Sequence, residues 1–214
     1  MATMSRGSRT TVSSPAALDL ALLATGLPAA PPPELDPYLD AAARCFSRHG
    51  MSRTSVPDIA RELGMSRTTV YRQIGTVGDA GRLLFARELR RLVEDLRPHL
   101  DDERSGPQIL IQLITTVVRR AQRHPVLSKV LADEPEVVDP FVTSDLAALV
   151  SRITAAVTPV LEIAMRSGLI AQRRPEAVAQ WLVRMTISLI VAPPPGDLDA
   201  LLAEMIEPTL TPLP

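Results

Sequence analysis

Apolar residues recur at intervals of three and four along most of the chain from residue 35 onward, which is the spacing of one face of an α-helix. No stretch alternates strictly between apolar and polar residues, and aromatic residues make up only 3% of the chain. Prolines and glycines divide this pattern into about nine segments. The sequence therefore predicts an all-α fold of about nine helices.

The apolar spacing and its breakers give a range for each expected helix. The ranges are 35–49, 56–63, about 67–74, a long helix that ends near residues 98–101, then 107–123, 125–133, 146–164, 175–192 and 197–207. In the long helix, Phe85 is expected to share one inward face with Leu89, Leu92 and Leu96. Residues 1–33 are rich in Pro, Ala and Ser and are expected to form a flexible tail.

The tail contains an apolar piece, Ala16–Leu27, for which a secretory signal is the alternative. Asp19 interrupts that piece and Pro28 follows it, so we favour a tail. The longest apolar run elsewhere, Ile109–Val118, falls short of the roughly 18–20 residues that span a bilayer. With one cysteine, Cys45, the chain is expected to be a soluble cytoplasmic protein without a membrane partner.

Positive charge is concentrated in one part of the chain, although the formal net charge is −1. Residues 98–214 hold 14 acidic and 10 basic residues, whereas residues 41–75 hold six arginines against Asp58 and Glu62. Such a local excess of arginine indicates a surface that attracts nucleic acid. A solvated helical face is the alternative explanation of the same charges.

Thr54–Ile74 carries the most informative local pattern. Ser55 and Asp58 form an S-x-x-D capping pair at the start of one short helix, and Gly64 supplies its stop. Ser66 then caps a second short helix, so the segment predicts a helix-turn-helix. The second helix of such a unit enters the DNA major groove, whereas an ordinary pair of packed helices is the alternative.

The segment resembles the TetR family of bacterial transcription regulators. The resemblance covers roughly Tyr38–Leu84 and is carried by A-A-x-x-F-x-x-x-G at residues 42–50, T-S-V-x-D-I-A at 54–60 and G-x-S-x-x-T-x-Y at 64–71. It implies a three-helix DNA-binding head at residues 34–80, and a helical effector-binding and dimerisation body at 81–214. It also implies a homodimer on a palindromic operator in double-stranded DNA, most often a repressor released by a small molecule.

By this resemblance the DNA-binding residues are Arg53, Thr54, Ser55, Ser66, Arg67, Thr68, Thr69, Tyr71, Arg72 and Gln73. Thr54, Ser55, Thr69 and Tyr71 would hold phosphates, while Arg67, Thr68 and Arg72 would approach bases. The chain departs from the family pattern at Gln73 and Ile74, where His and Phe are common. Val77 replaces a lysine that clamps a phosphate, and Arg82 is the candidate substitute.

The body holds few aromatic residues, so a pocket built from it would be aliphatic and would suit an apolar effector of unknown identity. The candidate pocket residues are Gln112, Thr116, Arg120, His124, Phe141, Trp181, Arg184 and Met185. An apolar stripe near the end of the chain predicts the dimer interface, formed by Trp181, Leu182, Met185, Ser188, Leu189, Leu201 and Met205. For the stripe, packing within a monomer is the alternative. For the pocket residues, the alternatives are a surface position for Arg120, a bond within its own helix for Thr116 and ordinary core packing for the apolar members.

No arrangement of residues indicates an enzyme. The three histidines lie far apart in the sequence, and no nucleophile or phosphate-loop motif is present. We therefore expect no catalytic residue, no metal and no cofactor. The alternative function is an architectural or cell-cycle DNA-binding or adaptor protein that has the same fold without a ligand switch.

Overall fold

The computed structural model describes residues 27–100, 104–134 and 146–212. Within these ranges the chain forms nine α-helices, two short 3-10 helices and no strand, so the predicted all-α fold is confirmed. Most of the predicted tail, including nearly all of Ala16–Leu27, and the candidate pocket residue Phe141 lie outside the described residues.

The helix bounds agree closely with the ranges expected from apolar spacing. The elements are η1 (Pro33–Leu35), α2 (Asp36–His49), α3 (Val56–Leu63), α4 (Arg67–Ile74), α5 (Val77–Leu96), η2 (Arg97–Leu100), α6 (Gly106–Arg123), α7 (Pro125–Asp133), α9 (Leu146–Arg166), α10 (Pro175–Val191) and α11 (Leu198–Leu210).

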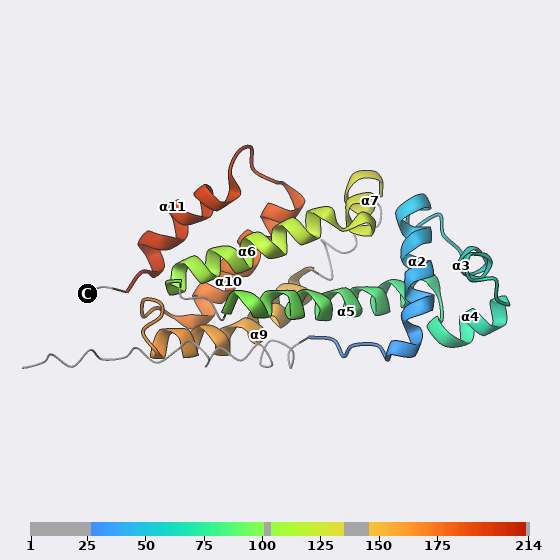
Figure 1. The fold of residues 1–214 in the computed structure, drawn as a ribbon, viewed down its shortest axis with the longest axis horizontal. Coiled ribbons are helices and arrows are strands. Elements are labelled where there is room, and N and C mark those ends of the chain that lie inside the picture. The colour runs from blue at the N-terminus through green and yellow to red at the C-terminus, as the bar shows by residue number, and fades with distance from the viewer. Residues whose placement is uncertain (1–26, 101–103, 135–145, 213–214) are drawn as a thin grey trace, which may run out of the picture.

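Helices α2, α3 and α4 form a compact head at one end of an elongated molecule (Figure 1). Their apolar faces meet in one cluster, in which Phe46, Ile59 and Val70 are fully buried. Val126 of α7 joins the same cluster, although α7 follows the body helix α6 in the chain. The head core is therefore completed by a helix from residues 81–214.

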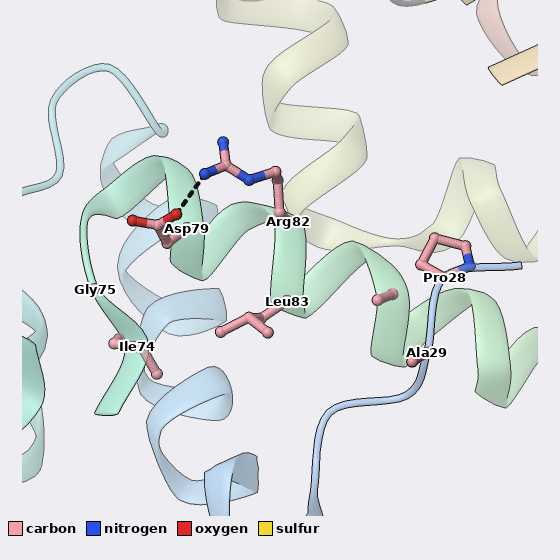
Figure 2. Close-up of a pocket in the computed structure, with 8 residues that line it drawn as sticks. Pro28, Ala29, Ile74, Gly75, Asp79, Arg82 and Leu83 are labelled. Carbon is pink, nitrogen blue, oxygen red and sulfur yellow. Dashed lines mark hydrogen bonds and ion pairs between the residues drawn. The ribbon is translucent and has the colours of Figure 1, made fainter. Parts of the chain in front are cut away.

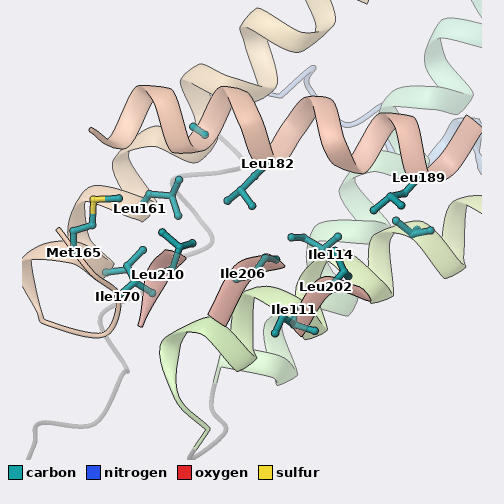
Figure 3. Close-up of a cluster of buried hydrophobic side chains, with 13 residues drawn as sticks. Ile111, Ile114, Leu161, Met165, Ile170, Leu182, Leu189, Leu202, Ile206 and Leu210 are labelled. Atoms are coloured by element: carbon teal, nitrogen blue, oxygen red, sulfur yellow. The ribbon is translucent and has the colours of Figure 1, made fainter. Parts of the chain in front are cut away.

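The body is built from α6, α9, α10 and α11, whose apolar side chains converge in a second cluster (Figure 3). Leu161 and Met165 enter it from α9, Leu182 from α10, and Leu202 from α11. Asp199 fixes α11 against α6, since its carboxylate accepts hydrogen bonds from Thr115 at 2.6 Å and from Arg119 at 2.8 Å.

Helix α5 runs from the head toward the body (Figure 1). Its residues Ala80 and Leu84 belong to the head cluster, whereas Leu96 packs with Leu100 and Ile109 in a third cluster. The buried Arg87 of α5 pairs with Asp36 at 3.0 Å and with Asp40 at 2.9 Å, and both acids belong to α2. Burial alone would lower the pKa of Arg87, but hydrogen bonds to these two carboxylates raise it above its ordinary value. This ionic contact holds α5 against the first turns of the head.

One side chain of α5 does not lie where its spacing predicts. Phe85 is 47% exposed, whereas Leu96 is buried. The buried residues of α5 near the head are Ala80, Leu84, Ala86 and Arg87. The assignment of Phe85 to the inward face is therefore wrong.

Helix α9 is the one described helix with the length and apolar composition of a membrane span, over Ala147–Arg166. About a third of that stretch is buried inside the protein, where it packs mainly against α10. Arg152 and Glu162 interrupt its apolar sequence. Because the core helix of a globular body has the same composition, we assign α9 to the body.

Candidate nucleic-acid interface

The turn between α3 and α4 has the geometry that its sequence predicts. The backbone N–H of Ser55 donates to Asp58 at 2.9 Å, which closes the start of α3. Gly64 ends α3 in the left-handed conformation, with φ +67. The Ser66 hydroxyl then accepts the N–H of Thr69 at 3.2 Å and caps α4. Two helices of eight residues each are thus joined by a short turn.

Helix α4 turns one face to the head core and the opposite face to solvent. Val70 and Ile74 are buried in the core. The exposed side chains of α4 are Arg67, Thr68, Tyr71, Arg72 and Gln73. Tyr71 is 58% exposed, so its hydroxyl is available to a partner surface. The helix therefore presents a continuous hydrogen-bonding surface of a size that fits a major groove.

The arginines of the head divide into two groups by their partners. Arg44 and Arg48 of α2 both bind Glu62 at 2.7 Å, and their hydrogen bonds lower the pKa of Glu62. Arg61 binds Asp58 at 2.9 Å in the same way. By contrast, Arg67 and Arg72 make no ion pair within the described part of the chain.

This division places the uncompensated positive charge of the head on α4. The carboxylates Asp58 and Glu62 neutralise arginines on α2 and α3, and none reaches the outer face of α4. Arg53, just before α3, is also exposed, and its Nε donates to the carbonyl of His49 at 3.0 Å. Asp133 and Glu134 lie near enough to offset part of its charge.

Thr54 does not lie where the family resemblance places it. Its side chain is buried, and its hydroxyl donates to the carbonyl of Gly50 at 2.6 Å. The hydroxyl therefore holds the α2–α3 loop together and does not face solvent. Ser55 is exposed, but its hydroxyl donates to Asp58, so a phosphate would have to compete with that carboxylate.

The start of α5 shows how the replacement of the family lysine by Val77 is accommodated. Thr76 caps this helix, and its N–H donates to Asp79 at 2.9 Å. Arg82 is exposed, but it is directed to Asp79 (Figure 2). The two side chains border a shallow open hollow of about 410 Å³. Its lining residues are Pro28, Ala29, Ile74, Gly75, Asp79, Arg82, Leu83 and Ala86.

The candidate pocket residues of α6 do not line a common hollow. Thr116 lies 3.1 Å from His99, Arg120 pairs with Asp95, and the His124 ring lies 3.8 Å from Glu88. All three partners belong to α5 or to η2 just after it, so these side chains join α6 to the connecting helix. Burial lowers the pKa of His124, which favours its neutral form.

The remaining described members of that set are also dispersed. Trp181 and Arg184 are exposed on the outside of α10, Met185 packs against the body core, and Gln112 is half-buried on α6. The second hollow in the described part of the chain, about 210 Å³, lies elsewhere, between the end of α6 and the α10–α11 connection. The described members of the set therefore lie on different faces, and the pocket itself stays a prediction.

The predicted dimer stripe separates into two faces. Leu182 and Leu189 are buried in the body core, so their assignment to the interface is wrong. Residues one position earlier in a helix point about 100° away, which explains why Trp181 and Ser188 are exposed. Met185 lies half-buried between these faces. The exposed large apolar side chains of α10 and α11 are Trp181, Val191, Leu201 and Met205.

A polar contact between the body and the head is not indicated by the sequence. The Glu134 carboxylate, at the end of α7, accepts the backbone N–H groups of Met51 and Ser52 at 2.7 and 2.8 Å. The partners lie more than 80 positions apart in the sequence. No local pattern could have indicated this contact.

The head of the molecule is similar to a known protein family. A family model described as bacterial regulatory proteins, tetR family, matches residues 39–73, which extend from α2 into α4. Over a longer range, the uncharacterized HTH-type transcriptional regulator Rv1255c of Mycobacterium tuberculosis (strain ATCC 25618 / H37Rv) is 28% identical over 180 residues. That alignment covers 83% of this chain and 85% of the relative.

Solved structures extend the similarity to the body. The TetR family repressor AlkX from Dietzia sp. strain DQ12-45-1b, implicated in biodegradation of n-alkanes, matches with a TM-score of 0.59 at 22% identity. This match covers 80% of this chain and 92% of AlkX. The fatty acid degradation regulator FadR from Bacillus halodurans matches with a TM-score of 0.60 at 18% identity, over 84% of this chain and 95% of FadR.

The head matches the family over its helix-turn-helix, the relative aligns along most of the chain, and the solved structures share the fold of head and body. The protein thus has a DNA-binding head that matches the tetR family model, and it is similar along most of its length to HTH-type transcriptional regulators.

Proposed function

We propose that the protein is a cytoplasmic homodimeric repressor that binds a palindromic operator and is released from it by a small apolar effector. The observation that carries the proposal is the outer face of α4, where Arg67 and Arg72 are exposed and free of ion pairs within the described residues. These two arginines can bind phosphate or guanine without first releasing an internal ion-pair partner.

On DNA, α4 would lie in the major groove with its N-terminal residues at the base edges. Arg67 and Arg72 have the forked donors that pair with guanine O6 and N7, and Gln73 has the amide that pairs with adenine. Thr69 and Tyr71 carry hydroxyls that suit phosphate oxygens. Arg53 would contact the DNA backbone beside the start of α3.

The dimer would form through the exposed apolar side chains of α10 and α11. Trp181 and Val191 on α10 and Leu201 and Met205 on α11 are exposed, and both helices belong to the part of the molecule away from the head (Figure 1). Association there would leave both heads accessible. Two copies would then read half-sites about 34 Å apart, or a multiple of that distance.

The effector would bind among the aliphatic side chains of the body. One observation supports a site beside α9, where the buried Thr154 hydroxyl makes no hydrogen bond within the described residues. A mainly apolar ligand with one polar group would satisfy it. AlkX and FadR, which share the fold, are connected by name to n-alkane and fatty acid degradation.

A gel-shift titration against the upstream region of the protein's own gene tests DNA binding. Arg67→Ala should weaken binding by about 1–3 kcal/mol and relax the preference at one base pair. Arg61→Ala is the matched control, because it removes the same charge from an exposed arginine that already pairs with Asp58. Equal affinity of both variants and the wild type would contradict the role of α4.

Dodecanoate and dodecane, added to the preformed complex, test the effector. Release of DNA by either compound is the expected result. The response to dodecanoate should be weaker in Thr154→Val, because only dodecanoate has a polar group that can bind the Thr154 hydroxyl. The alternative is a DNA-binding protein of this fold without a ligand switch. DNA binding that no apolar compound affects would support this alternative.

A further inference from the structure

Helix α7 belongs to the body by sequence but contacts the head along its length. It follows α6 directly, and its first residues are capped by His124, whose ring nitrogen accepts the N–H of Leu127 at 3.4 Å. Val126 then enters the head core and Val130 packs against it. Figure 1 shows α7 between α6 and α2. The helix thus forms a strut between the two parts of the molecule.

The end of this strut carries a buried carboxylate that binds the α2–α3 loop. Glu134 is 1% exposed. One carboxylate oxygen accepts the Met51 N–H at 2.7 Å, and the other accepts the Ser52 N–H at 2.8 Å and the Ser52 hydroxyl at 2.5 Å. Hydrogen bonds to an ionised acceptor are short and directional, so three of them fix this loop more firmly than its own backbone contacts do.

Gly50 provides the space that the carboxylate occupies. A Cβ added at Gly50 would lie 2.5 Å from the Oε1 atom of Glu134, and the backbone φ there is +84. The carboxylate therefore lies directly over the loop backbone. Burial alone would raise the pKa of Glu134, but the hydrogen bonds from Ser52 and Met51 outweigh it and hold the pKa below its ordinary value.

The loop that Glu134 holds leads directly to the DNA-facing surface. Ser52 is followed by Arg53, whose Nη groups are not needed for its contact with the carbonyl of His49. Ser55 then begins α3. Any change in the path of Met51 and Ser52 moves the backbone from which Arg53 extends, because only one peptide unit separates them.

We infer that Glu134 is a positioning residue for DNA binding, which holds Arg53 and the start of α3 where they meet the DNA backbone. This inference rests on the proposed contact between Arg53 and phosphate. It assigns to the body a direct role in the affinity of the head, through a contact that a change in α7 can strengthen or release.

If only the charge of Glu134 mattered, its removal would strengthen DNA binding, whereas the inference predicts weaker binding. The direction of the change in affinity therefore tests the inference. Glu134 and Asp133 both place negative charge near Arg53. If charge alone mattered, removal of either acid would strengthen the attraction to DNA. If Glu134 positions the loop, its removal weakens binding, whereas removal of the exposed Asp133, which pairs with Lys129, does not.

The experiment compares Glu134→Asp, Glu134→Gln and the control Asp133→Asn by fluorescence anisotropy with operator DNA over a range of salt concentrations. Glu134→Asp keeps the charge but shortens the side chain by one methylene. It therefore distinguishes the loss of the hydrogen bonds to the loop from the loss of negative charge. We expect both Glu134 variants to bind about tenfold more weakly. We also expect the slope of log Kd against log salt to fall by about one phosphate contact. Asp133→Asn should bind as tightly as the wild type or more tightly.

A double-variant cycle with Arg53→Ala distinguishes positioning from a general loss of structure. In the Arg53→Ala background, Glu134→Asp should cost little further affinity, because the contact that it positions is already absent. Full additivity, or wild-type affinity of Glu134→Asp, would overturn the inference. If the Glu134 variants do not fold, Ser52→Ala, which removes one of the three hydrogen bonds, should show a smaller change of the same sign.

The outcomes separate this inference from the proposed function. If the wild-type protein does not bind the operator, the proposed function fails. If it binds and Arg53→Ala lowers the salt slope while the Glu134 variants do not, only the inference on Glu134 fails.

Discussion

Two glycines of the head have a left-handed backbone for different reasons. Gly64, with φ +67 and ψ 28, has no atom within 4 Å of the place where a Cβ would stand, so only the turn requires it. Gly50, with φ +84 and ψ 165, lies in a region that glycine alone occupies readily, and Glu134 fills the space beside it. Glycine is therefore required at position 50 both by the backbone conformation and by the space that Glu134 occupies.

Alanine substitutions should separate these requirements. Gly64→Ala should lower the free energy of unfolding by about 1 kcal/mol, the cost of left-handed backbone. Gly50→Ala should cost about 3 kcal/mol or more, because the added methyl also displaces a buried carboxylate. Urea unfolding followed by circular dichroism measures both. Equal costs would show that Glu134 is not held over Gly50.

Single residues also show which parts of the site were predictable. Gly64, Ser66 and Asp58 act on neighbours within a few positions, so the sequence was sufficient to place the turn and both short helices. The environment of Thr54 was not predictable, because its burial depends on how the α2–α3 loop folds back to the carbonyl of Gly50.

Whole helices show the same distinction between local pattern and packing. The range of each helix follows from capping residues and apolar spacing, which are local. Which polar face of α6 meets which partner is set by packing, so Arg120 pairs with Asp95 of α5 and the His124 ring lies beside Glu88, although the sequence suggested a pocket there. In α10, a stripe that is continuous in the sequence divides between Leu182 in the core and Trp181 at the surface.

The attachment of α7 to the head should depend on pH. The folded-state pKa of Glu134 is lowered, so its contribution to stability is present above the ordinary glutamate pKa of about 4.3 and is lost as pH falls through the folded value. The difference in unfolding free energy between wild type and Glu134→Gln should be constant from neutral pH down to that range. Below it, the difference should shrink.

Urea unfolding between pH 7 and pH 3 gives that difference directly. Asp133→Asn is the control, and it should change the acid limb less, because the ion pair of Asp133 with Lys129 is exposed and screened by solvent. Parallel wild-type and Glu134→Gln curves through the whole acid range would show that the contact between α7 and the α2–α3 loop does not depend on the charge of Glu134.

At the scale of the whole molecule, the head lies at one end, and α11 lies over the body, anchored to α6 through Asp199 (Figure 1). This anchor fixes which face of α11 remains outside. Leu202 and Ile206 are buried, whereas Leu201 and Met205 are exposed. A rigid outer apolar face at this position is what a second copy of the chain would need in order to bind both bodies and leave both heads free.

Met205→Glu should therefore give a monomer, because a carboxylate in the middle of an apolar interface has no partner to offset its dehydration. Light scattering after size-exclusion chromatography measures the mass. Phe85→Glu is the matched control, since Phe85 is exposed to a similar degree, 47% against 51%, but lies on α5.

The monomer should bind a full palindrome about 100-fold or more weakly than the dimer does, because the second head no longer binds as part of the same complex. Its affinity for an isolated half-site should be unchanged, since no residue of the head is altered. A Met205→Glu protein that stays dimeric would move the interface away from the outer face of α11.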